Sequence, residues 1–229
     1  PVEDFEFVVF FNARNIRRKL PGDVILSFST FVDMLPEEKR NKCLLLMHTN
    51  PIDENGTDLM AVSDAVAPGK NVKFSTEKIT PEGLNYLYNF ADVTINLASN
   101  EGFGLGTAES VMAGTPMIVN VTGGMQDQCG FRLDGKLLTA EDYTEIHSLH
   151  DEKKWKDNSR LTYGSWTKPI WPTNRSLQGS IPTPYIFDDR PSFEDAAEKL
   201  YEWYQTPKED RDKVGLEGRE WMLREDTCL

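Results

Sequence analysis

Five short, nearly continuous apolar runs, separated by segments of helical periodicity, most limit what this chain can fold into. The runs occupy residues 6–11, 43–48, 72–75, 93–98 and 117–121. Such runs are typical of parallel strands that are buried on both faces. The sequence therefore predicts an α/β fold, a Rossmann-like parallel sheet with helices on both faces. Sheets of this kind bind ligands beyond the carboxyl ends of their strands, so chemistry is expected in the loops that follow the five runs.

Helical patterns fill the segments between and after these runs. Thr80 is placed to cap a helix that opens at Pro81. An apolar stripe of helical period also runs through residues 193–204. Directly after it, Thr206 and Glu209 have the spacing of a capping box, which predicts a last helix.

Residues 131–184 break this rhythm because they are rich in Pro, Ser, Gly and Trp. We interpret them as an irregular insertion with few regular elements, within a single domain that spans residues 1–229. Its tryptophans, Trp155, Trp166 and Trp171, indicate that the insertion packs against the rest of the protein.

Charge and cysteine usage exclude several classes of function. A formal charge of −12 disfavours coating nucleic acid or binding an anionic membrane, because both need a basic surface. No apolar run approaches the ~18 residues that suggest a membrane span. The scattered cysteines, Cys43, Cys129 and Cys228, show no metal-ligand spacing, so reduced thiols and a cytoplasmic location are expected. His147 and His150 lack a third ligand, which predicts a solvated pair and no metal site.

The segment EGFGLGTAE at residues 101–109 follows the fourth apolar run. Its glycines let a ligand approach backbone N–H groups at the start of a helix, near Gly104 or Leu105, and this is an anion site suited to phosphate. Glycine turns also serve tight packing alone. A dinucleotide-binding fingerprint is excluded, because Thr107 stands at the place of its third glycine and the next strand lacks the ribose-binding acid.

Two glutamates frame this segment. Glu101 lies at the carboxyl end of the strand, where it could accept hydrogen bonds from a sugar. The apolar neighbours of Glu109 predict a buried carboxylate, which is costly unless hydroxyls or cations bind it, and ribose hydroxyls would satisfy it. Singly, Glu101 could be a helix-end charge and Glu109 a surface residue. Together with the glycines, they favour a ligand site.

A cationic cluster follows the first apolar run. Arg14, Arg17, Arg18 and Lys19 fall within six residues of a chain whose net charge is −12. The Arg fork and the compact Lys charge both suit phosphate oxygens. For Arg17 and Arg18, a solvated charge run explains the sequence equally well.

The segment at residues 101–109 resembles the E-x7-E motif of family 4-type retaining glycosyltransferases, which have the two-domain GT-B fold. The resemblance covers residues 5–130 and, as closing helices, 185–224, whereas 131–184 have no counterpart. It implies that the chain is the C-terminal, donor-binding domain and that the N-terminal acceptor domain is absent from it. The start at Pro1 fits a processed chain or a piece of a longer protein.

The same resemblance implies roles for individual residues. Arg14 and Lys19 have the spacing of the family's GR…K element, which binds the donor diphosphate and would neutralise its charge as it leaves. Glu101 would contact hydroxyls of the donor sugar, Glu109 would contact the ribose, and residues 75–79 would flank the base. The remaining donor contacts would come from Gly102, Phe103, Gly104, Leu105, Gly123 and Gly124.

Three positions depart from the family pattern. Ala13 and Leu20 stand where Gly is common, and Asp127 stands where the family's GGxxE turn has Glu.

The activity implied is transfer of a sugar from a nucleoside diphosphate sugar to a glycan, lipid or protein acceptor, with retention of configuration. By this resemblance it requires no cofactor and no metal. Alone, the chain would bind donor without transferring it. A GT-B-type epimerase or phosphorylase, or a non-catalytic nucleotide-binding module, are the alternatives. An epimerase needs acid and base residues from both domains, and a phosphorylase of the glycogen type needs a pyridoxal-bearing lysine.

Overall fold

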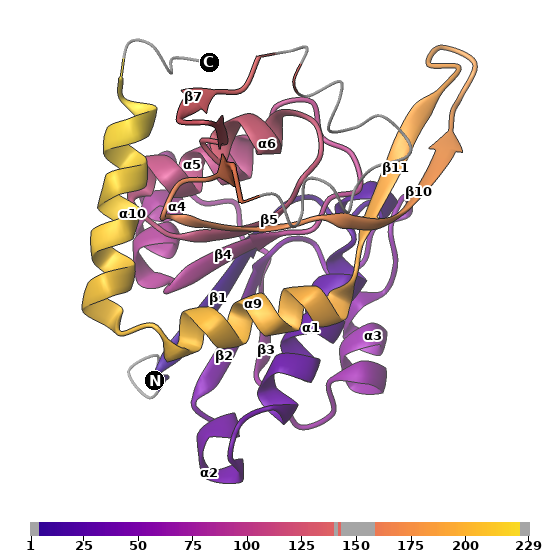
Figure 1. Cartoon of the computed structure of the whole chain (residues 1–229). Helices are drawn as coiled ribbons and strands as arrows, with labels where there is room; N and C mark the ends of the chain where they lie inside the picture. The colour runs from indigo at the N-terminus through magenta and orange to yellow at the C-terminus, as the bar shows by residue number, and fades with distance from the viewer. Residues whose placement is uncertain (1–4, 140–141, 143–158, 225–229) are drawn as a thin grey trace.

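A six-stranded parallel sheet forms the centre of the molecule (Figure 1). The computed structural model describes residues 5–139, 142 and 159–224. The strand order is β3-β2-β1-β4-β5-β9, and every pairing is parallel. The strands are β1 (Phe7–Asn12), β2 (Cys43–His48), β3 (Val72–Ser75), β4 (Val93–Asn96), β5 (Met117–Asn120) and β9 (Thr167–Ile170). The predicted Rossmann-like sheet is confirmed, and the first five strands lie at the five apolar runs.

Helices cover both faces of this sheet. The helical elements in the described part of the chain are η2 (Arg17–Lys19), α1 (Pro21–Asp33), α2 (Glu37–Arg40), α3 (Leu59–Val66), α4 (Pro81–Phe90), α5 (Leu105–Ala113), α6 (Gly124–Gln128), α9 (Phe193–Gln205) and α10 (Lys208–Met222). Along β1, Phe7, Val9 and Phe11 enter the core that α1 and α9 cover, whereas Val8 and Phe10 pack towards α4. This double burial explains why the strands are apolar throughout. None of the described helices is both long and apolar enough to cross a membrane.

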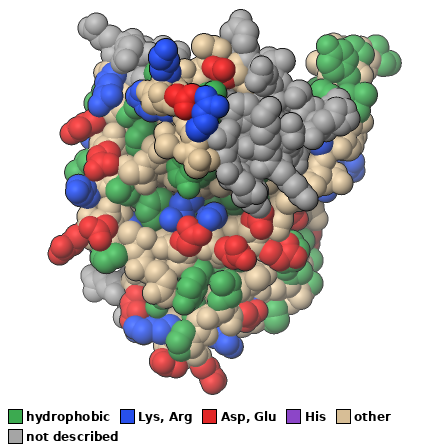
Figure 2. All heavy atoms as spheres, viewed as in Figure 1, with side chains coloured by type: hydrophobic (Ala, Val, Ile, Leu, Met, Phe, Trp, Pro, Cys, Tyr) green, Lys and Arg blue, Asp and Glu red, His purple; other side chains and the backbone are tan. Residues whose placement is uncertain are grey.

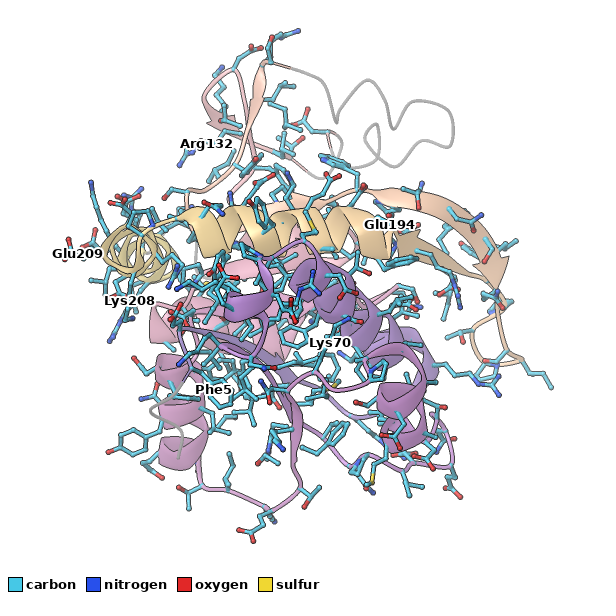
Figure 3. All side chains as sticks on the ribbon, turned by 90° about the horizontal axis from the view of Figure 1, so that it is seen from below. Phe5, Lys70, Arg132, Glu194, Lys208 and Glu209 are labelled. Atoms are coloured by element: carbon cyan, nitrogen blue, oxygen red, sulfur yellow. The ribbon has the colours of Figure 1, made fainter. Side chains whose placement is uncertain are left out.

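The last two helices join differently from the prediction. Thr206 Oγ1 donates to the Glu202 carbonyl at 2.8 Å and so closes the end of α9. Helix α10 follows Pro207 without a side-chain cap, so the predicted capping box of Thr206 and Glu209 is wrong. A residue before proline is pushed towards extended backbone, and the chain turns here. In Figure 3, α9 runs from Glu194 to α10, which is seen end-on.

The described part of residues 131–184 is more regular than predicted. Strand β9 extends the main sheet by pairing with β5, and β6 (Arg132–Leu133), β7 (Lys136–Leu137) and β8 (Leu161–Thr162) form a small antiparallel sheet. The expectation of few regular elements is therefore corrected. Pro169 lies inside β9, where an edge strand tolerates the missing N–H.

Trp166 anchors this region to the body. The side chain is 6% exposed, and its ring lies 5.1 Å from that of Trp221 in α10, with 34° between the ring planes. Three glycines make room for it, since a Cβ would lie 2.9 Å or less from its side chain at Gly130, Gly164 and Gly218. Trp171 packs in the same cluster, so the predicted packing is confirmed for both tryptophans. The predictions that fall outside the described residues concern Trp155, His147, His150 and Cys228.

A hairpin arm, formed by β10 (Pro172–Gln178) and β11 (Ile186–Pro191), extends away from the sheet (Figure 1). At its root, the Asp189 amide donates to the Ser99 carbonyl at 2.8 Å, and the Asp189 carboxylate accepts from Thr122 Oγ1 at 2.8 Å. Residues 176–187 carry no charged side chain. Ile181 is fully exposed, and Figure 2 shows hydrophobic side chains gathered at the end of the arm. The arm therefore starts beside the loop that follows β4.

Candidate functional site

The strand order places the site between β1 and β4. Strands β1, β2 and β3 follow one another towards one edge, and β4, β5 and β9 follow towards the other. The order therefore reverses between β1 and β4, and open parallel sheets bind ligands beyond the carboxyl ends at such a point. The two loops that start here carry the cationic cluster and the glycine-rich segment.

Lys19 and Glu101 meet at this point. Lys19 Nζ donates to Glu101 Oε2, and Arg18 Nη1 lies 3.2 Å from the same oxygen and donates to the Asn100 carbonyl at 2.9 Å. The Lys19 and Glu101 side chains are only 14% and 10% exposed. Charges this sheltered need each other, because an unpaired one would lose its hydration without compensation. The structure thus joins two predicted site residues and adds Arg18.

Arg14 is placed elsewhere. Its guanidinium forms a two-pronged ion pair with Asp53, with N···O distances of 2.8 and 3.2 Å, and its side chain is 61% exposed. The hydrogen bond from Arg14 lowers the pKa of the Asp53 carboxyl below its ordinary value. Arg17 is exposed, and its amide donates to the Asn55 carbonyl at 3.2 Å. Of the cationic cluster, only Arg18 and Lys19 therefore contact Glu101.

The glycine-rich turn after Glu101 leads into α5 through Gly104, whose φ of 86° suits glycine. Within the described residues, the amides of Gly102, Phe103, Gly104 and Leu105 donate no hydrogen bond. Phe103 and Leu105 are 40% and 70% exposed. Gln128 supports the turn, because its Nε2 donates to the Phe103 carbonyl at 2.6 Å. The start of α5 therefore offers unpaired N–H groups at a positive helix end.

Gly123 and Gly124 lie behind this turn. The Gly124 amide reaches the carbonyls of Glu101 and Gly102 at 3.2 and 3.1 Å. A Cβ on Gly123 would lie 1.7 Å from the Glu101 carbonyl oxygen, and one on Gly124 would lie 2.5 Å from that of Gly102. Both glycines therefore allow two backbone segments to touch, and this contact fixes the position of Glu101. Asp127 follows in α6. Direct contact of these residues with a donor stays a prediction.

Glu109 differs from the expectation of a buried carboxylate, because it is exposed. Its Oε2 accepts from the Tyr88 hydroxyl at 2.8 Å and lies 3.4 Å from Asn12 Nδ2. The helix turns Glu109 away from the core, whereas Ser110 and Val111 are buried. A cavity of about 360 Å³ between α4 and α5 is lined in part by Glu109 and Tyr88. The carboxylate thus keeps the ligand access that its role would need.

Sequence reasoning missed two residues of this edge, Asn12 and Tyr88, which both contact Glu109. The sequence left Arg18 open between a phosphate site and a solvated charge run, and the structure shows that it contacts Glu101. Asn12 is the last residue of β1, so its place at a strand end was the one available signal. Tyr88 could not be distinguished from a core residue of an amphipathic helix. Where the predicted base loop begins, Ser75 Oγ lies 3.0 Å from His48 Nδ1.

The described residues contain no group of three or more His, Cys, Asp or Glu side chains that could hold a metal ion.

No protein-family model matches the sequence, and a search of curated proteins finds no match to it. Solved structures match in fold. A structure from E. coli described as "Trehalose-6-phosphate … bound with UDP-2-fluoro glucose" has a TM-score of 0.59 at 10% identity. WaaG, described as a glycosyltransferase involved in lipopolysaccharide biosynthesis, has 0.59 at 16%, and sucrose-phosphate synthase from Thermosynechococcus elongatus has 0.58 at 17%.

The matches cover 96%, 98% and 96% of this chain, respectively. They cover only 40%, 44% and 41% of the other chains. This is the fold of part of a GT-B glycosyltransferase. The chain spans less than half the length of the structures that it resembles.

Proposed function

We propose that this chain is the donor-binding domain of a retaining, metal-independent glycosyltransferase that takes its sugar from a nucleoside diphosphate. The observation that carries the proposal is the convergence of Lys19, Arg18 and Glu101 at the reversal of strand order, next to the free amides that start α5. Positive charge and N–H donors suit a diphosphate, and a carboxylate suits sugar hydroxyls. One edge thus supplies both halves of a nucleotide-sugar site.

In this proposal the diphosphate lies over Lys19 and the amides of residues 102–105. Negative charge grows on the diphosphate as the sugar bond breaks, and a fixed cation stabilises that charge without a metal. Arg14 would join by leaving Asp53, which its exposure permits. Glu101 would bind the sugar, and Glu109 would bind the ribose from α5. Similarity to a structure described as bound with UDP-2-fluoro glucose supports a nucleotide-sugar donor.

Transfer also needs an acceptor site, which we assign to a further, N-terminal domain. The structures with this fold are more than twice as long as the region that this chain matches. The chain alone would therefore bind donor and transfer nothing. Cys43 and Cys129 are free and buried, and burial raises the pKa of each thiol to about 12. Inert thiols of this kind are consistent with the cytoplasmic setting that is part of the proposal.

The two glutamates give the sharpest test. Glu109→Gln should weaken both the bare nucleoside diphosphate and the sugar-bearing donor. Glu101→Gln should weaken only the sugar-bearing donor, and it should leave the bare diphosphate unchanged or tighter, because Lys19 loses a competing carboxylate. Each loss should be about 1–3 kcal/mol, the range for a hydrogen bond with one charged partner. Calorimetry with UDP, GDP and ADP and their glucose conjugates measures the affinities.

Glu38→Gln is the matched control, since Glu38 is an exposed carboxylate in α2, at the opposite end of the sheet (Figure 1). It should bind every ligand like the wild type. Identical profiles for the two site variants would refute the division of roles, and normal binding by both would refute the site.

A further inference from the structure

Side chains from three separate elements meet at one atom, the hydroxyl oxygen of Tyr88. Asn12 ends β1, Tyr88 lies in α4 and Glu109 lies in α5. Asn12 Nδ2 donates to the Tyr88 hydroxyl at 2.8 Å, and this hydroxyl lies 2.8 Å from Glu109 Oε2. The Gly106 carbonyl lies 3.1 Å from the same hydroxyl. Because Asn12 already donates to the hydroxyl, the phenol proton is free for the carboxylate, which is the closer and the charged acceptor.

Tyr88 is held rigidly. Its side chain is 2% exposed, and its ring packs edge-on against Phe10 with 5.1 Å between ring centroids. Thr115 Oγ1 donates to the Tyr88 carbonyl at 2.8 Å, which ties this turn of α4 to the end of α5. Burial raises the pKa of Tyr88 far above its ordinary value, so the hydroxyl keeps its proton at every working pH. The hydroxyl is thus a fixed donor at the end of a buried ring.

Glu109 is the opposite case, an exposed side chain with three rotatable bonds. Ordering such a side chain has an entropic cost, which is met either before a ligand arrives or when it binds. Tyr88 and Asn12 contact Oε2 alone. Within the described residues, no donor reaches Oε1. One carboxylate oxygen is therefore anchored and the other is available.

We propose that Tyr88, together with Asn12, is a positioning residue that presets Glu109 so that its free oxygen accepts the two hydroxyls of a ribose. This inference rests on the proposed function, which supplies the ribose. It assigns to Tyr88 a share of the discrimination between ribonucleotides and nucleotides that lack the 2′ and 3′ hydroxyls. Tyr88 touches no ligand itself and acts only through Glu109.

The test compares UDP with 2′,3′-dideoxyuridine diphosphate on wild type, Tyr88→Phe and Glu109→Gln. The change to Phe keeps the buried ring and removes only the hydroxyl. Tyr88→Phe should weaken UDP binding roughly three- to tenfold, the worth of one hydrogen bond, and leave the dideoxy analogue unchanged. In the Tyr88→Phe/Glu109→Gln double variant, the extra loss over Glu109→Gln should be less than about twofold, because both changes act on one contact.

Tyr86→Phe provides the control. Tyr86 lies in the same helix, but its side chain is 74% exposed, so this variant should bind both nucleotides like the wild type. Thermal melting of each variant without nucleotide separates a loss of fold from a loss of binding.

The outcomes distinguish the inference from the proposal beneath it. If wild type prefers UDP over the dideoxy analogue and Tyr88→Phe keeps the full preference, the positioning role is wrong and the nucleotide site stands. Equal losses for both nucleotides in Tyr88→Phe would assign Tyr88 to packing and likewise overturn the inference. If wild type binds UDP and the dideoxy analogue equally well, the ribose role of Glu109 is refuted. If wild type fails to bind UDP, the proposed UDP site itself is refuted. Either result also refutes the positioning role of Tyr88.

Discussion

Leu20 adopts a left-handed backbone conformation, with φ 49° and ψ 44°, between η2 and α1. Glycine reaches this region freely, whereas a side chain with a Cβ is strained there. The side chain is nevertheless 7% exposed and belongs to the main core. Burial of the leucine thus offsets the strain. This left-handed turn gives a physical reason why glycine is common at this position in the family that the sequence resembles.

Replacing Leu20 should reverse the usual order of alanine and glycine. Both variants lose the buried side chain, which costs about 2–4 kcal/mol. Only Leu20→Ala keeps the strain, so Leu20→Gly should be the more stable of the two by about 1 kcal/mol. Urea unfolding measures the difference. At Leu59, which is also buried but has ordinary helical backbone, alanine should be the more stable replacement, and the same order at Leu20 would contradict the argument.

Partner choice among the cations was the part of the site that sequence could not settle. The alternation of strands and helices brings Lys19 and Glu101 to one edge, so their proximity follows from the pattern. That Arg14 pairs with Asp53 depends on the loop after β2, which the cluster's own sequence does not describe. Arg18 turns towards Glu101 because η2 winds the chain there, and no residue pattern announces so short a turn.

At the scale of elements, α10 and α5 touch through glycines. A Cβ on Gly215 of α10 would lie 1.8 Å from the carbonyl oxygen of Gly114, the residue that ends α5. Gly114 itself has φ 81°, so it requires glycine for its own backbone. The helix at the end of the chain is therefore held against the helix that carries Glu109 by direct backbone contact.

Gly215→Ala should consequently destabilise the protein, although alanine is the better helix former by about 1 kcal/mol. The added methyl must separate α10 from α5, and overpacking of this kind costs about 1–3 kcal/mol. Gly22→Ala in α1 is the matched control, because the nearest atom to its Cβ would be 3.8 Å away. Thermal unfolding should show a lower Tm for Gly215→Ala and an equal or higher Tm for Gly22→Ala. A stabilised Gly215→Ala would show that the two helices separate without penalty.

Elements that are marked by their own residues could be predicted from the sequence. Elements that form only by pairing with a distant segment could not. Thr80 caps α4 as expected, accepting from the Gly83 amide at 3.2 Å. Strand β9 was missed because Lys168 and Pro169 interrupt its apolar pattern, and it becomes a strand only by pairing with β5. The predicted capping box was wrong for a related reason. The Thr206 hydroxyl could bond either to the end of α9 or to the start of α10, and it donates to the Glu202 carbonyl of α9.

Across the whole molecule, the net charge of −12 makes the cationic site a local exception. If Lys19, Arg18 and the start of α5 hold the diphosphate, no divalent ion is needed. Saturating EDTA should therefore leave the affinity for a nucleotide sugar unchanged, and added Mg²⁺ should change it less than about twofold. Calorimetry in chelated buffer checks this. A loss of binding on chelation that Mg²⁺ or Mn²⁺ restores would assign the diphosphate to a metal.

The contact between Trp166 and Trp221 provides an intrinsic spectroscopic signal of the folded state. One indole lies directly before the edge strand β9 and the other lies in α10, and their rings lie 5.1 Å apart. Chromophores this close share their electronic excitation, which splits an absorption band into two circular-dichroism components of opposite sign. We expect that couplet only while α10 keeps Trp221 packed against Trp166. Light absorbed by two native side chains therefore reports, without any label, whether the C-terminal helix is docked.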